Sequence, residues 1–233
     1  MQGPTLGGRN TIYGAASMEA NGNSGNLFEL VHEAAYRDIY RFESDGDGHC
    51  PYSGVAVAPN GTLYGTVVGY GYGGNPNGSV WQFTTQNGLR TLYVFQNGND
   101  GEWPDQAPIV DAAGNIYGTT HIRNGKPFAG AVWKIDTSGN FSVVHDLYGA
   151  TDGYGPNSPL LPDKDGNLYG TTLLGGTDNF GTVYRVTPTG GFSVVHAFAN
   201  RGDGVQPTGN LVSDGQGVIY GGTGSGSVFK ITP

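Results

Sequence analysis

Short stretches in which hydrophobic and polar residues alternate recur along the whole chain, with turn-rich segments between them. One kind carries an aromatic residue between aliphatic neighbours, as in "SVWQF" around Trp81 and "AVWKI" around Trp133, and another reads "RTLYVF" or "FSVVHDL". Alternation with a period of two predicts β-strands with one buried face. The 43 glycines among 233 residues favour tight turns between short strands over helices. The pattern therefore predicts an all-β protein.

A repeated Tyr-Gly phrase shows that these strands form copies of one unit. The phrase appears as "NTIYGAA", "GTLYGTV", "GNIYGTT", "DGNLYGTT" and "GVIYGGT", with spacings of 51, 53, 52 and 51 residues between successive tyrosines. Each unit holds a short apolar run, the Tyr-Gly strand, the aromatic strand and an outer strand. A regular period of about 52 residues is typical of repeat architectures. The repeated tyrosines are Tyr13, Tyr64, Tyr117, Tyr169 and Tyr220.

A four-stranded sheet cannot cover both of its own faces, so five such sheets are expected to pack face to face around an axis. We therefore predict one domain over residues 1–233, a five-bladed β-propeller of four-stranded antiparallel blades. An open solenoid is the alternative that the repeat leaves. The fifth blade ends at "SVFKITP" without an outer strand, and we expect residues 1–5 to close the ring because an open sheet edge invites association.

The charge of the chain limits the kinds of partner that it is expected to bind. Eleven basic and 19 acidic residues give a net charge of −8, and no Lys/Arg cluster offers the surface that nucleic acid requires. No apolar run approaches the roughly 18 residues of a membrane span. The start "MQGPTLGGRN" lacks the features of a signal peptide; we expect an extracellular or cell-surface protein whose leader lies outside this sequence. We expect a monomer that binds a small molecule or glycan. The single Cys50 excludes an internal disulfide.

The repeated motif resembles a known family. The order D-G-x-x-P, L-V, G-N-L-Y-G-T-T and G-T-V-[FY]-x-[LV]-T-P is similar to the GloVer-type tandem repeat of bacterial secreted and surface proteins, most closely between Asp152 and Pro207. This resemblance implies a fold and a location but no reaction, because the family is defined by its repeat. In blade number and length the chain is also similar to five-bladed tachylectin-type lectins, although the lectin motifs are absent.

Function must therefore come from the loops that share one face of the propeller. These are the links from an outer strand to the next blade and the links between second and third strands. Asp47, Asp100, Asp152 and Asp203 begin the first set, and "DKDGN" at Asp163 resembles a calcium loop. A carboxylate ring for Ca²⁺ or a sugar is one interpretation. Turn formation by Asp-Gly is the favoured one, and "DKDGN" is interpreted as a hairpin.

The loops of the first three blades break the repeat with groups that can titrate or bind anions. Where the fourth link has Val205 and Gln206, earlier links carry His49 with Cys50 and Glu102 with Trp103. Such an asymmetric cluster is what a single reaction centre needs. We predict the catalytic residues His49, Glu102, Asp105 and His121. Substrate-binding candidates are Trp103, Arg123, Lys126, Tyr154, Tyr52, Asp47 and Asp100.

Two function classes remain open at this point. A hydrolase or lyase would use Glu102 with Asp105 or Asp47 as acid and base on a glycan or small polar substrate. A lectin-like module would use exposed aromatic residues as stacking surfaces. No cofactor is required by the sequence. Zn²⁺ at His49, His121 and a carboxylate is chemically sensible, as is Ca²⁺ at the acidic loops, but no metal-ligand spacing is present, so no metal site is assigned. His145 and His196 on outer strands are expected to pack rather than to react.

Overall fold

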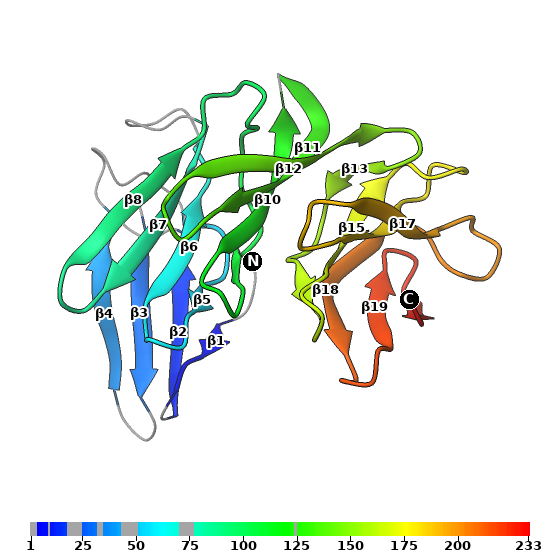
Figure 1. The fold of residues 1–233 in the computed structure, drawn as a ribbon. Helices are drawn as coiled ribbons and strands as arrows, with labels where there is room; N and C mark the ends of the chain where they lie inside the picture. The colour runs from blue at the N-terminus through cyan, green and yellow to red at the C-terminus, as the bar shows by residue number, and fades with distance from the viewer. Residues whose placement is uncertain are drawn as a thin grey trace.

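The computed structural model describes residues 4–8, 10–17, 25–31, 35–42, 51–69, 77–123 and 125–233. All regular secondary structure in these residues is β-strand, arranged as five antiparallel, mostly four-stranded sheets in a five-bladed propeller (Figure 1). The predicted fold class and blade number are confirmed. The described part of the chain contains no helix that could cross a membrane.

Blades one to four each run from a two-residue inner strand to a longer outer strand, and blade five differs. Blade one contains β1 (Thr5–Leu6), β2 (Thr11–Ala16), β3 (Asn26–Val31) and β4 (Ala35–Arg41), and blade two contains β5 (Ala56–Val57), β6 (Leu63–Val67), β7 (Ser79–Thr84) and β8 (Gly88–Val94). Blade three contains β9 (Ile109–Val110), β10 (Ile116–Arg123), β11 (Lys126–Ile135) and β12 (Phe141–Gly149). Blade four contains β14 (Leu161–Pro162), β15 (Leu168–Leu174), β16 (Thr182–Val186) and β17 (Phe192–Ala197), and blade five contains β18 (Pro207–Ser213), β19 (Ile219–Thr223) and β20 (Val228–Ile231).

Two details of the strand pairing differ from the sequence prediction. The link β13 (Gly153–Pro156) pairs with both β12 and β15, so blades three and four form one continuous hydrogen-bonded sheet. Blade five has three strands in the described residues, and Thr5 pairs with Tyr13 in blade one rather than adding to blade five. The expected ring closure through residues 1–5 is therefore wrong at Thr5, because β1 is already the inner strand of the first blade; residues 1–3 lie outside the described chain.

The repeated Asp-Gly of the links has a structural role. Asp203 accepts hydrogen bonds from the amides of Ala199 and Arg201 at 3.1 and 3.0 Å, and its carboxylate lies 3.1 Å from the imidazole Nε2 of His196. Asp152 makes the same contact with His145, and Asp100 with the Tyr93 hydroxyl. The predicted turn role is confirmed at these three links, and the outer-strand histidines pack as predicted; His145 stacks on Phe192 with ring centroids 3.6 Å apart.

Hydrophobic clusters between neighbouring blades form the core. Four clusters join blades one to two, two to three, three to four and four to five. In all five blades the repeated aromatic residue covers the glycine of the neighbouring Tyr-Gly strand, as Trp133 covers Gly118. Only a residue without a Cβ leaves room for the ring there, so the Tyr-Gly phrase is a packing requirement.

Gly118→Ala tests this packing. An added Cβ at Gly118 would overlap the Trp133 ring, and overpacking of a rigid core costs roughly 1–3 kcal/mol. We expect denaturant unfolding to show a loss of that size. Gly8→Ala is the matched control, because a Cβ there meets nothing within 4 Å, and its effect should stay within about 0.5 kcal/mol. Equal effects of the two substitutions would contradict the packing role.

Candidate functional site

The link 100–107, which leads from blade two into blade three, is fixed against the end of β10 by its backbone. The Glu102 amide donates to the Ile122 carbonyl at 2.8 Å, and the Ile122 amide donates back to Glu102 at 3.2 Å. The amide of His121 donates to the Trp103 carbonyl at 3.1 Å. These bonds bring two predicted site segments, one from a link between blades and one from a second-to-third strand link, to the same face of the propeller.

The bridge brings a carboxylate to an imidazole. Nδ1 of His121 lies 3.7 Å from Oδ2 of Asp105, with 20% and 31% of the two side chains exposed. This distance is that of an ion pair rather than a direct hydrogen bond. A carboxylate that faces one nitrogen of an imidazole is a common arrangement at sites of proton transfer. The arrangement therefore suits His121 to accept and release protons.

Burial perturbs both acidic residues of the link. Glu102 is 9% exposed, and burial raises the pKa of its carboxyl group above the usual value. Burial also raises the pKa of Asp105, while the neighbouring His121 opposes that shift. Loss of hydration disfavours the charged form of a carboxyl group. Of the two residues, Asp105 faces His121, and a carboxyl group of perturbed pKa that faces a histidine is expected at an acid-base site.

Two residues that the sequence did not single out hold this link. The hydroxyl of Thr66 in β6 donates to the Pro104 carbonyl oxygen at 2.6 Å and lies 2.8 Å from the Ser53 hydroxyl. The Gln106 side-chain amide donates to Oδ1 of Asp105 at 3.3 Å. Thr66 thus connects the first and second links, and Gln106 orients the carboxylate that faces His121. Thr66 belongs to the repeated Tyr-Gly-Thr phrase, so only its contacts distinguish it.

Trp103 adopts a left-handed backbone, with φ of 57°, and its side chain is partly exposed. The residues at the same place in the next two links, Gly155 and Gln206, also have positive φ, 69° and 52°. The repeat therefore imposes this conformation in every described link from blade two onward. It strains a tryptophan more than a glycine.

Each of the other predicted site residues that the structure describes has surroundings of its own. Asp100 is committed to its turn, where it accepts from the Gln96 and Gly98 amides. The hydroxyl of Tyr154 in the next link donates to Asn179 at 2.5 Å. Arg123 pairs with the exposed Lys126 in the backbone register of the β10–β11 hairpin. Tyr52 is exposed in the first link. Asp47, His49 and Cys50 lie outside the described residues.

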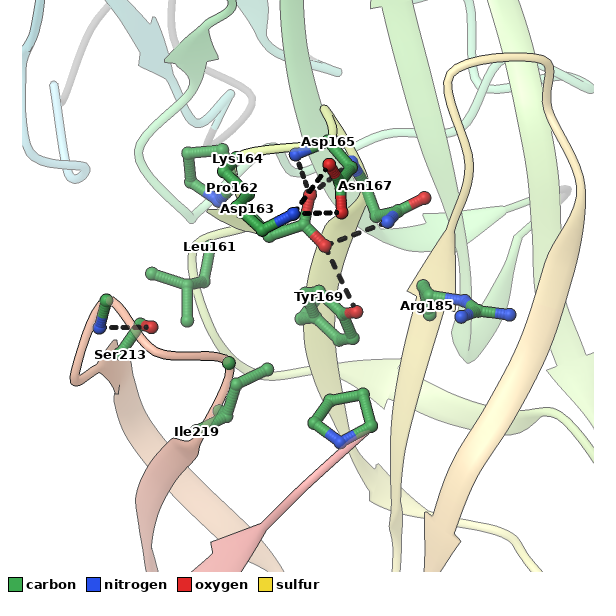
Figure 2. A pocket seen from close by; sticks show the side chains of 13 residues that line it. Leu161, Pro162, Asp163, Lys164, Asp165, Asn167, Tyr169, Arg185, Ser213 and Ile219 are labelled. Atoms are coloured by element: carbon green, nitrogen blue, oxygen red, sulfur yellow. Dashed lines mark hydrogen bonds and ion pairs between the residues drawn. The ribbon is translucent and has the colours of Figure 1, made fainter.

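A cavity of about 420 Å³ lies on the opposite face, between the first hairpins of blades four and five (Figure 2). Asp163 belongs to its lining, but its carboxylate accepts from the Asp165 and Asn167 amides, both at 2.9 Å. Lys164 pairs with Asp165 at 2.9 Å. These contacts confirm that "DKDGN" forms a hairpin. Three charged groups of the cavity wall are thus already engaged, while Arg185 projects from β16 beside Tyr169 (Figure 2).

No group of three or more potential metal ligands among His, Cys, Asp and Glu occurs within the residues that the structure describes. Asp105 and His121 supply two donors on the candidate face. A stable protein metal site generally needs more ligands than two.

The chain belongs to the Gloeobacter/Verrucomicrobia repeat family, whose model matches residues 1–232. Among curated proteins none matches in sequence. Similar solved structures include virginiamycin B lyase from Staphylococcus aureus, with 14% identity, a TM-score of 0.58, and 98% of this chain and 68% of that chain covered. A putative gluconolactonase has 16% identity, a TM-score of 0.58 and coverage of 99% and 73%. Puromycin hydrolase has 14% identity, a TM-score of 0.59 and coverage of 99% and 35%. At these identities the likeness shows the fold.

Glu102→Gln tests the burial of the site. Below the pH range in which carboxyl groups ordinarily titrate, Glu102 is protonated in both the folded and the unfolded state. The substitution should therefore leave the melting temperature unchanged there. As pH rises, the unfolded chain ionises first because the folded pKa is raised, and the wild type loses stability that the variant keeps. We expect the variant to melt at a higher temperature than the wild type at pH 7, and the difference to disappear at low pH.

Asp203→Asn is the control of opposite sign. Although burial opposes the shift, hydrogen bonds from the Arg201 and Ala199 amides and from His196 lower the pKa of Asp203 in the fold. Its ionised form therefore stabilises the protein above the unfolded pKa, and that contribution disappears as pH falls through the folded pKa. The variant should melt below the wild type at pH 7. A melting difference for Glu102→Gln that does not change with pH would contradict the burial of that carboxyl group.

Proposed function

We propose that the protein is a hydrolase or lyase whose reaction centre is formed by Glu102, Asp105 and His121 on the link face of blade three, and that it acts on a glycan or another small polar substrate. The observation that carries this proposal is the pairing of Asp105 with His121 at 3.7 Å, together with the burial of Glu102 in the same link. The other histidine–aspartate pairs recur in the repeat and have a different position. In His196 with Asp203, for example, the histidine lies on an outer strand and the aspartate in the turn that follows it.

The chemistry follows from the environment of each group. Asp105 orients the imidazole, and His121 takes a proton from water or from a carbon-bound position of the substrate. Glu102, protonated to higher pH than an exposed glutamate, donates a proton to the leaving group. General acid-base catalysis by positioned groups of this kind contributes about 10²- to 10⁴-fold each.

The names of several similar solved structures support the proposed reaction class. Virginiamycin B lyase, a putative gluconolactonase and puromycin hydrolase are enzymes by their names and are similar to this chain in fold, so a similar architecture supports bond cleavage in those proteins. Fold alone does not define a reaction. The site residues therefore carry the proposal. The protein is further proposed to work outside the cell or at its surface, as expected for the secreted proteins that carry this repeat.

A lectin-like function without catalysis is the second candidate. Trp103 and Tyr52 are exposed aromatic residues on links of the same face. Aromatic faces provide stacking surfaces for sugar rings at low entropic cost. The strained backbone of Trp103, at a place where blade four has Gly155, is consistent with selection for its side chain.

The first experiment is a hydrolase and lyase substrate panel, followed by kcat/KM for single variants. His121→Ala, Asp105→Asn and Glu102→Gln should each lower kcat/KM by about 10²-fold or more while the variants remain folded. His196→Ala is the matched control, because His196 also faces an aspartate but lies on an outer strand; it should affect stability rather than turnover. Wild-type rates in all three site variants would refute the reaction centre.

Trp103→Ala separates catalysis from binding. If the protein is an enzyme, the variant should raise KM for a cyclic substrate, whereas His121→Ala should lower kcat. If the protein is a lectin, Trp103→Ala should abolish glycan binding measured by calorimetry and His121→Ala should leave it intact, with no turnover of any substrate. Unchanged binding and turnover in Trp103→Ala would remove this residue from the site.

A further inference from the structure

The cavity between blades four and five is large enough for a small organic molecule. It lies between two turns, the one that joins β14 to β15 and the one that joins β18 to β19 (Figure 2). Its volume of about 420 Å³ is within the range of ligand sites in proteins, and it is many times the space that one water molecule occupies. A site of this size suits a ring-sized molecule better than a single ion.

The sheet of blade four places a cation, Arg185, in the wall of this cavity. Leu161, Tyr169 and Arg185 are register partners on three adjacent strands, so their side chains share one face of the sheet. Leu161 and Tyr169 contribute to the hydrophobic cluster that joins blades four and five, so this face looks toward blade five. The neighbours of Arg185 along β16, Tyr184 and Val186, are buried on the opposite face, which fixes the backbone that carries the cation.

Arg185 has no acidic partner in the part of the chain that the structure describes. Its guanidinium forms no ion pair there, and its Nε atom has no hydrogen-bond partner. Burial raises the pKa of the adjacent Tyr169 hydroxyl and Arg185 opposes that rise, so the group beside Arg185 is uncharged at neutral pH. In blade three the cation at the same register position, Lys134, lies over the Tyr117 ring, 5.4 Å from its centroid. A half-buried cation without a counter-charge favours an anionic ligand.

The acidic groups of the cavity wall are committed to the turn of blade four. The Asp163 carboxylate accepts hydrogen bonds from the Asp165 and Asn167 amides. It also accepts from the Asn167 side chain at 2.8 Å and from the Tyr169 hydroxyl at 3.3 Å. Asp165 pairs with the exposed Lys164. Because the carboxylates and the amine of this wall are engaged, the cavity is suited to binding a ligand rather than to acid-base chemistry on it.

The rest of the wall offers apolar surface and open space. Leu161 and Ile219 line the cavity from the two facing blades. On blade five, a Cβ added to Gly215 or Gly217 would meet no atom within 4 Å, so the backbone of this turn leaves room beside it. Apolar side chains next to a guanidinium suit a ligand that is both cyclic and anionic. The planar guanidinium of Arg185 matches a carboxylate, which it can bind through two parallel N–H···O bonds.

We propose that this cavity is a binding site for a small cyclic carboxylate, whose carboxylate group pairs with Arg185 while its ring lies against Leu161 and Ile219. The site is separate from the proposed reaction centre, which lies on the opposite face of the propeller, so the proposal does not depend on that function. The molecule bound here is expected to remain unchanged and to be distinct from the substrate.

Calorimetric titration with benzoate tests the site. Benzoate combines a carboxylate with a flat ring and should bind with a Kd of roughly 1 mM, as expected of a ligand of its size. Benzamide keeps the ring without the charge, and acetate keeps the charge without the ring, so each should bind at least about tenfold more weakly. An affinity for benzamide or acetate equal to that for benzoate would overturn the proposal, as would the lack of benzoate binding at concentrations well above this Kd.

Two substitutions locate the bound benzoate. Arg185→Gln should weaken binding by at least about tenfold, because it removes the charged partner. Ser213→Phe should weaken binding too, because the larger side chain occupies the cavity from blade five while Arg185 stays in place. Lys134→Gln is the matched control, since it removes the cation at the same register position of blade three, outside the cavity wall; this variant should bind benzoate like the wild type.

Circular dichroism should show that all three variants are folded, and one readout needs no variant. In a nuclear magnetic resonance titration of the wild type, the Nε–H signal of Arg185 should move with benzoate and stay in place with benzamide. Benzoate binding that is unchanged in both Arg185→Gln and Ser213→Phe would overturn the proposal. Equal weakening by Lys134→Gln, or an Arg185 signal that does not respond to benzoate, would overturn it as well.

Discussion

The contact between a repeated aromatic ring and a glycine on the neighbouring strand is the interaction on which the structure depends. Trp81 covers Gly65, Trp133 covers Gly118, and the same contact recurs in blades one, four and five. The ring fills the space between two sheets only because the glycine has no side chain. Each contact lets the ring lie close against its own sheet, where it joins the core shared with the preceding blade. A chain with few charged residues and short strands gains its stability from these interfaces.

The residues that stabilise the blades are different from the residues that vary in the links. The links between blades keep a common backbone, with an Asp-Gly turn and a residue of positive φ at Trp103, Gly155 and Gln206. Thr66 anchors the second link from blade two. Side chains at the variable positions of a link can then change without disturbing the blades. This explains how Glu102, Asp105 and His121 are tolerated where the next unit of the repeat carries Tyr154, Asn157 and Leu173.

The period of the Tyr-Gly phrase was sufficient to predict the fold, because an interface that recurs in space requires its residues to recur in sequence. Glu102, Asp105 and His121 could be named as candidates because they break that period. Their arrangement in space could not be predicted, because the bridge between Glu102 and Ile122 joins two segments through backbone hydrogen bonds that have no sequence signature. Gln106 and Thr66 were missed for the same reason. The cavity beside Asp163 could not be predicted because it forms between two hairpins about one repeat apart in the sequence. The pairing of Thr5 with Tyr13 in blade one could not be predicted either, because no sequence motif specifies it.

The most direct test of the account is a crystal structure of the protein with the substrate or inhibitor that the panel identifies. The account predicts that the ligand lies on the link face of blade three, with polar atoms within hydrogen-bonding distance of His121 and the Glu102 carboxyl group. A ligand bound instead in the cavity beside Asp163 and Arg185, with the link face unchanged, would contradict it.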